Sequence, residues 1–474
     1  MQINRNMSAV IANNHLLGIE DRLSASIERL SSGLKINKAS DNPAGMAISN
    51  KMKAQIDALD QAEANAADGI SVVQIADGAL NEVSSILQRI RELSVQAANG
   101  TTSFDDRQSI QDEVNELVKE VDRISTDTEY NTKKLLDGSS NVRVYGENGS
   151  RYQVSDSVDA KVYSLNVESV ATQATVELNY ETPQASGLLN INGVGVNISE
   201  GMSREAYLQA VRNGASEAGC SVEISEDGSK MLILSDYYGY DEEITVSVSE
   251  ELAIASGVTG HKDCEYLADE KLYKVHTTGV DAVVKIPTQL EEAGFTTTTT
   301  VECNGNRVVV SDNDGFSIDF LLNEDYKPVA DAENGNFEID VTDIGSLTIQ
   351  IGANEYQTMD VRIDEISSYT LYLDCVDVAI ENGADRAMGT LDEAIARVSA
   401  ARSRIGAFQN RLEYAEKSLS SSVENITAAY SGLLDTDMAE EMTEYTQQNI
   451  LNQAAISVLS QANELPQQIL SMLQ

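Results

Sequence analysis

The chain has 474 residues and a formal net charge of −43, from 76 Asp and Glu against 33 Lys and Arg. Nucleic acids and anionic membrane surfaces are bound through clustered basic residues, so this charge argues against both as partners. Apolar residues make up 42 % of the chain, which suffices for a folded protein. The chain contains no run of about 18 uncharged apolar residues, which is the length that a membrane-spanning helix needs. The N-terminus also lacks the apolar core of a secretory signal peptide.

The first 39 residues predict a terminal helix, because apolar residues recur every three or four positions. Asn42 followed by Pro43 is typical of a helix start, since a polar cap precedes proline in the first turn. A second helix is therefore expected from 43 to 98. The apolar positions of the first helix are Leu23, Ile27, Leu30 and Leu34.

Apolar residues in this second helix repeat every seven positions, which favours a left-handed superhelical seam between helices. The helix should end at Asn99-Gly100. Ser103 with Asp106 three residues later has the pattern of a capping box, so a third helix should begin there. The seven-residue line of the long helix is Met52, Leu59, Ala66, Val73, Leu80 and Leu87.

Residues 140–378 are rich in Thr, Val, Tyr, Gly and acidic residues, and they carry most of the negative charge. Their alternating apolar pattern and turn signals predict β-hairpins at 188–199, 220–235 and 296–311. Residues 203–218 have helical spacing.

The C-terminal region again predicts long helices. Leu391, Val398, Ile405, Leu412, Leu419, Ile426 and Leu433 lie seven residues apart. Pro466 interrupts the last helix and should either bend it or mark a new first turn. Its apolar seam includes Leu451, Val458, Leu465 and Ile469.

Seams at both ends of the chain need partners, and the simplest solution pairs the N- and C-terminal helices. The charges favour this pairing, because 1–39 is mildly basic and no basic residue follows Lys417. The predicted fold is α+β, with long terminal helices in an antiparallel coiled-coil rod and β-rich inserted outer domains.

Catalytic, cofactor and metal sites find little support. His261 and His276 lie near Asp263, Cys264 and Glu265 but lack a ligand spacing, so surface positions are expected. Cys220, Cys264, Cys303 and Cys375 form no C-x-x-C pair. Buried thiols are favoured for them, and disulfides are the alternative. We therefore expect no enzyme, no metal and no cofactor.

Several segments at both ends resemble bacterial flagellin. The match is dense over about 1–140 and 345–474, while 187–260 is similar to an insertion module of some flagellins and hook-associated proteins. The matching segments are 7–15, 29–37, 40–48, 87–99, 350–355, 402–412, 444–446, 449–455 and 462–468.

The resemblance implies the structural subunit of the extracellular flagellar filament used for motility, a helical homopolymer exported by the flagellar type III apparatus. Expected partners are further copies, hook-associated and cap proteins, and an export chaperone on the C-terminal helix. The implied domains are inner-tube helices at 1–42 and 432–474, a rod at 43–140 and 345–431, a β-rich connection at 141–186, the module at 187–260 and a second outer domain at 261–344.

The resemblance also implies recognition by host Toll-like receptor 5, at positions matching Arg89, Leu93 and Glu113. A structural alternative has Leu93 packed in the helical bundle and Arg89 as a solvated charge. Two rival functions remain: a hook–filament junction protein, which shares the terminal patterns, and an adhesin displayed on the filament, with binding placed in 187–345.

Overall fold

The structure is a computed structural model that describes residues 6–155, 157–225, 227–240, 242–267, 271–287, 294–296, 298–328, 336–380 and 382–472. The chain divides into two compact units. Unit 1 contains residues 1–69, 349–359 and 411–474, and unit 2 contains 70–348 and 360–410.

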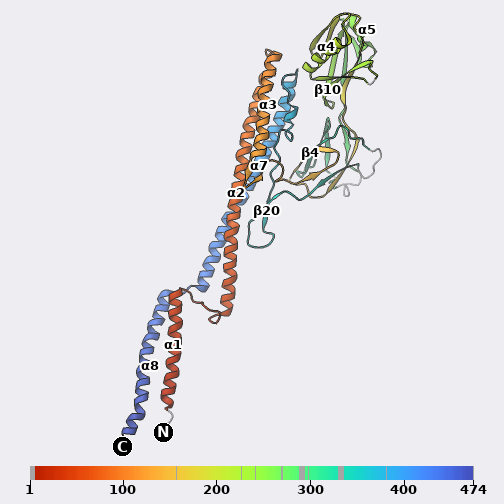
Figure 1. The fold of residues 1–474 in the computed structure, drawn as a ribbon. Coiled ribbons are helices and arrows are strands. Elements are labelled where there is room, and N and C mark those ends of the chain that lie inside the picture. Colours follow the sequence, from red (N-terminus) through yellow and green to blue (C-terminus); the bar gives the residue numbers. More distant parts are fainter. Residues whose placement is uncertain are drawn as a thin grey trace. The chain divides into compact units, whose positions relative to one another are not determined.

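Long helices occupy both ends of the chain, as predicted (Figure 1). None of the helices in the described residues combines the length and apolar character needed to cross a bilayer. The fold is α+β, with a β-rich middle. The long helices are α1 (Met7–Ser32), α2 (Pro43–Ala97), α3 (Phe104–Asp127), α7 (Gly383–Leu434) and α8 (Met438–Met472).

The predicted helix starts have the expected local causes. α2 begins at Pro43, and the Asn42 side chain accepts a hydrogen bond from the backbone N–H of Gly45 at 2.9 Å. α3 has a complete capping box between Ser103 and Asp106. α8 continues through Pro466 to Met472, so no new first turn begins there, and a bend of the helix at Pro466 stays a prediction.

The seven-residue seams of α2 and α7 are buried except at Met52, Leu59, Ile426 and Leu433, which are half-buried. In unit 2, the two helices run antiparallel, since Arg91 bonds Asp392 at 2.6 Å while Asp77 accepts from Arg402 at 2.9 Å. In unit 1, Ala62, Ala66 and Leu419 share one apolar cluster. The seam residues with less than a tenth of their surface exposed are Ala66, Val73, Leu80, Leu87, Leu391, Val398, Ile405, Leu412 and Leu419.

The β-rich part of unit 2 has two apolar cores. The first belongs to a region that we call the β-base, formed by two four-stranded sheets, β14-β5-β18-β3 and β15-β16-β17-β4. Its strands are β3 (Val144–Tyr145), β4 (Gly149–Val154), β5 (Val162–Ser169), β14 (Val283–Lys285), β15 (Thr300–Asn304), β16 (Arg307–Ser311), β17 (Ser317–Leu322) and β18 (Phe337–Val341).

The second core belongs to a module inserted into the β-base, with sheets β6-β10-β9 and β12-β13-β11-β7-β8. The three predicted hairpins are confirmed as β7–β8, β9–β10 and β15–β16, and helix α4 lies where helical spacing placed it. The elements are β6 (Gln173–Asn179), β7 (Gly187–Ile191), β8 (Val194–Ile198), α4 (Arg204–Glu217), β9 (Cys220–Ile224), β10 (Lys230–Tyr238), β11 (Glu243–Ser249), α5 (Glu250–Ser256), η1 (Val258–Gly260), β12 (Cys264–Leu267) and β13 (Leu272–Thr278).

The module enters and leaves the β-base at one point. The N–H of Thr172 donates to the carbonyl of Val280 at 2.8 Å, and the N–H of Val280 donates to the carbonyl of Thr172 at 3.2 Å. The module core runs from Ala174 to Val275, which crosses the predicted boundaries at 187 and 260. Those boundaries stay a prediction. The remaining short elements are β1 (Glu129–Tyr130), β2 (Lys133–Lys134), β19 (Leu347–Gln350), β20 (Thr358–Val361) and η2 (Leu373–Cys375).

The four cysteines are free thiols, so the disulfide alternative is not the observed state. Cys220 is buried, Cys264 and Cys303 are intermediate, and Cys375 is exposed. Burial raises the pKa of the Cys220 thiol to about 12.

Candidate assembly and receptor surfaces

The terminal helices α1 and α8 form an antiparallel pair within unit 1, with both chain ends at the same end of the pair (Figure 1). At the other end, Leu34 and Asp435 form an antiparallel bridge, and the N–H of Thr436 donates to the carbonyl of Gly33 at 2.9 Å. Gly33 takes a left-handed φ of 74°, which lets α1 end there. This confirms the predicted pairing of the terminal helices.

The predicted charge complementarity also has a direct contact. The Arg29 guanidinium lies 3.5 Å from the Glu441 carboxylate. Near the chain termini, Asn6 donates from its side chain to the carbonyl of Ala462 at 2.8 Å. Contacts of this kind tie α1 to α8 at both ends of the pair.

The inner face of α8 is unexpectedly polar. The positions of α8 that are least exposed recur every three or four residues, as a helix packed along one face requires. Three buried oxygens at this face, Ser26 Oγ, Glu441 Oε1 and Gln448 Oε1, have no hydrogen-bond partner among the described residues. The least exposed set on α8 is Glu441, Tyr445, Gln448, Asn452, Ala455, Leu459 and Ala462.

Large apolar side chains instead point away from the pair. Of the predicted seam, Leu23, Leu30 and Leu34 are half-buried, while Ile27, Leu451 and Val458 are exposed. The side chains of Leu465 and Ile469 lie outside the described residues. The exposed apolar set on the two helices is Met7, Val10, Ile11, Leu17, Ile27, Met438, Met442, Ile450, Leu451, Ile456 and Val458.

Part of this exposed surface is hollowed. A shallow, open groove of about 560 Å³ lies on α8 and mixes apolar side chains with threonine hydroxyls and one amide. Its lining residues are Met442, Thr443, Thr446, Gln447, Ile450 and Leu451.

The residues predicted for receptor binding lie in unit 2. Arg89 of α2 donates to Glu113 of α3 at 2.8 Å and also pairs with Glu92 at 3.3 Å. These hydrogen bonds raise the pKa of the Arg89 guanidinium. Arg89 and Glu113 are about half exposed, whereas Leu93 is only 2 % exposed and packs in the helical core. The structure thus brings Arg89 and Glu113 together on the surface and places Leu93 beneath it.

Comparison with known proteins decides the family. Residues 3–141 match the protein family described as "Bacterial flagellin N-terminal helical region". Residues 388–473 match the family described as "Bacterial flagellin C-terminal helical region". A flagellin from Clostridium tyrobutyricum is 32 % identical over 98 % of this chain and 100 % of its own length. The chain belongs to the flagellin family. Flagellins are structural proteins, not enzymes.

The comparisons also include a second relative and a solved structure. Flagellin D from Vibrio anguillarum is 31 % identical to this flagellin, over 100 % of this chain and 99 % of its own length. Among solved structures, FliC from Burkholderia pseudomallei covers 72 % of this chain and 99 % of its own, at 18 % identity and a TM-score of 0.24.

Proposed function

We propose that this flagellin polymerises into the extracellular filament through the exposed apolar faces of α1 and α8. The observation that carries the proposal is the outward position of Ile27, Leu451 and Val458 on a helix pair whose own seam is partly polar. Contiguous exposed apolar side chains mark a protein interface, and a further copy of the chain supplies matching faces. An interface between different faces that does not close on itself builds a helical filament.

The polar seam supports a subunit whose terminal helices order on assembly. Each buried oxygen without a partner costs about 1–3 kcal/mol, so the pair of α1 and α8 gains little from its own contact. Burial of a Leu or Val by a neighbouring subunit contributes about 1.5–3 kcal/mol per side chain. The neighbour therefore supplies much of the free energy that orders these helices.

Electron microscopy after salt-induced polymerisation tests the proposal. Val458→Asp should abolish long filaments, because it places a charge on the assembly face. Gln453→Asp is the matched control, since Gln453 is exposed on the same helix and polar already; it should leave filaments intact. Filaments of normal length from Val458→Asp would exclude this face from assembly.

We further propose export by the flagellar type III apparatus, with the groove on α8 as the chaperone site, followed by contact with hook-associated and cap proteins at the filament ends. A shallow groove with Met442, Ile450 and Leu451 on one helix suits a helical partner protein. Titration calorimetry with the flagellar export chaperone should show binding to the full chain and at least tenfold weaker binding to Ile450→Asp. Equal affinity would place the chaperone elsewhere.

Toll-like receptor 5 is a proposed host partner, supported by the exposed pair of Arg89 and Glu113 on neighbouring helices. Their charges offer both a donor and an acceptor to a receptor surface, while the buried Leu93 is not accessible to a receptor. Arg89→Ala should weaken receptor pull-down without changing filament assembly. Lys119→Ala is the control, because Lys119 is an exposed cation on α3 with a local partner, Glu116. Unchanged receptor capture by Arg89→Ala would refute this role.

A further inference from the structure

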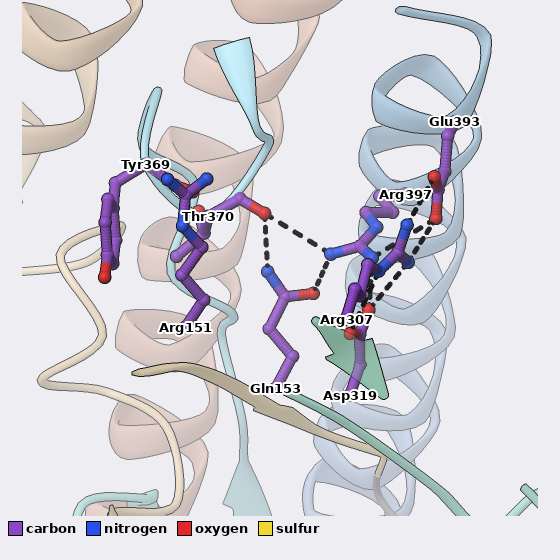
Figure 2. Close-up of polar contacts among 8 residues, drawn as sticks. All are labelled: Arg151, Gln153, Arg307, Asp319, Tyr369, Thr370, Glu393 and Arg397. Atoms are coloured by element: carbon purple, nitrogen blue, oxygen red, sulfur yellow. Dashed lines mark hydrogen bonds and ion pairs between the residues drawn. The ribbon is translucent and has the colours of Figure 1, made fainter. Parts of the chain in front are cut away.

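A cluster of charged side chains joins the β-base to helix α7 inside unit 2 (Figure 2). It draws on five segments of the chain: β4, β16, β17, residues 369–374 and α7. Figure 2 shows Gln153, Arg307, Asp319, Glu393 and Arg397 meeting between the strands and α7, with Arg151 and Tyr369 to one side. The residues drawn are Arg151, Gln153, Arg307, Asp319, Tyr369, Thr370, Glu393 and Arg397.

Arg307 connects the sheet to the helix. Its Nε donates to Asp319 Oδ1 at 3.1 Å and its Nη2 donates to Asp319 Oδ2 at 2.8 Å. This is a bidentate ion pair between β16 and β17. Its Nη1 donates to Glu393 Oε2 of α7 at 2.7 Å, and Nη2 also bonds Glu393. Hydrogen bonding to Arg307 lowers the pKa of the Glu393 carboxyl, so this acid stays charged.

Arg397 makes the reverse connection, from the helix to the sheet. Its Nη1 donates to Gln153 Oε1 of β4 at 2.5 Å and to the carbonyl of Thr370 at 3.3 Å. Its Nη2 bonds Asp319 and reaches Glu393 at 3.2 Å. Asp319, which is 8 % exposed, thus accepts from arginines of both the β-base and α7.

A third arginine extends the cluster. Arg151 donates to Asp374 at 3.0 and 2.5 Å and to the carbonyl of Tyr369 at 2.8 Å. The guanidiniums of Arg151, Arg307 and Arg397 lie 4.5, 5.0 and 5.5 Å from the centre of the Tyr372 ring. Tyr372 has a left-handed φ of 56°, an uncommon backbone state that holds its ring among these cations.

The apolar core of the β-base does not extend to α7 in the described part of the chain. The core of the β-base consists of residues between 142 and 341 and contains none from α7. A cavity of about 950 Å³ lies beside the cluster and is lined by Gln153, Arg307, Asp319, Glu393 and Arg397, among others. The contacts between the β-base and α7 that carry the argument are therefore charged and polar ones, and a cavity lies beside them.

We propose that this charge cluster is a latch that fixes the orientation of the β-base on α7. Two ion pairs cross the junction directly: Arg307 with Glu393, and Arg397 with Asp319. Removing one partner leaves the remaining charges without compensation, so the contact opens while the two apolar cores stay intact.

Distances between spin labels on the full-length monomer test the latch, independently of polymerisation. Labels are attached through p-acetylphenylalanine at Val162 of β5 and Ser399 of α7, two exposed sites, so that the native cysteines stay untouched. The unaltered chain should give one narrow distance distribution. Glu393→Gln with Arg397→Met should widen it at least twofold.

Two controls keep the result decisive. Asp392→Asn removes the neighbouring acid of α7, whose partner Arg91 lies on α2, and should leave the distribution unchanged. If the double variant loses β-structure by circular dichroism, Glu393→Gln alone decides, because Glu393 is half exposed and glutamine keeps its shape. A narrow, unshifted distribution in a folded variant overturns the proposal.

Discussion

The polar seam between α1 and α8 allows a sharp test of how the terminal helices are held. Glu441 is 8 % exposed and Gln448 is 4 % exposed, and each has one oxygen without a hydrogen-bond partner among the described residues. The second oxygen of Glu441 faces Arg29 at 3.5 Å. Replacement of both residues by apolar ones, Glu441→Met with Gln448→Leu, should strengthen the pair.

The size of the effect follows from these contacts. Each new apolar side chain contributes about 1.5–3 kcal/mol on burial, so the two together contribute roughly 3–6 kcal/mol. The Arg29 pair is lost, but its arginine is 39 % exposed, so the loss is at most about 1 kcal/mol. A net gain of about 3 kcal/mol multiplies the pairing equilibrium by about 100, since each 1.4 kcal/mol is a factor of ten.

Hydrogen exchange of the monomer measures this gain. Backbone amides of α8 between 441 and 462 should exchange about 100-fold more slowly in the double variant, because exchange requires local opening. Gln453→Leu is the matched control, because this glutamine is exposed and its replacement buries nothing. Exchange in α8 that is unchanged or faster would refute the reasoning that polar side chains limit the pair.

Three other predictions concern unit 2. Leu80→Ala, at a fully buried seam position, should cost about 2–5 kcal/mol in denaturant unfolding, whereas Ile75→Ala, at a site 41 % exposed, should cost little. Ser103→Ala should lower helix stability by about 1 kcal/mol. The hydrogen bonds from Ser103 lower the pKa of the Asp106 carboxyl. The stabilisation that they give is therefore present above the ordinary pKa of 3.8 and is lost as the pH falls through the lowered pKa. Hydrogen exchange of the first-turn amides of α3 measures this loss. Removal of 173–279 should leave a folded β-base, because the flanking residues are already hydrogen-bonded neighbours; loss of its β-sheet circular dichroism would contradict this.

Local signals predicted much of the fold. The capping box at Ser103 and the proline start at Pro43 act over three or four residues, so they can be read without knowing the partners. The hairpin turn at Asn192-Gly193 takes φ values of 45° and 98°, which that residue pair tolerates best. The buried faces of α2 and α7 could also be predicted, because a long seven-residue repeat determines which face of a helix is buried.

The pairing face of α8 could not be selected by apolarity. Leu451 and Val458 are the most apolar line of that helix, yet they are exposed, while Gln448 and Glu441 face α1. Apolar periodicity identifies the helix faces whose burial is favourable, but it does not show whether the same chain or another copy buries them. In a subunit that belongs to a polymer-forming family, the strongest apolar line can be reserved for another copy.

The charge cluster on α7 was missed for a different reason. Arg307, Asp319 and Gln153 are distant in sequence from the helix that they contact, so no spacing rule joins them. The only local signal is Glu393 with Arg397, an i, i+4 pair typical of any exposed helix. Only the topology of the β-base brings the other members to it.

The polar seam and the exposed apolar line together link helix ordering to assembly. Ordering a residue costs about 1–2 kcal/mol of backbone entropy, and the internal contact of α1 and α8 offsets this poorly because of its unpaired oxygens. In the assembly proposed above, contact with a neighbour through Leu451 and Val458 supplies the difference, so ordering and polymerisation become one equilibrium. In a monomer whose helices are already ordered by Glu441→Met with Gln448→Leu, the entropy of ordering is lost before assembly begins. Its critical concentration for filament growth should therefore fall, and a raised critical concentration would show that these polar side chains face partners in the filament.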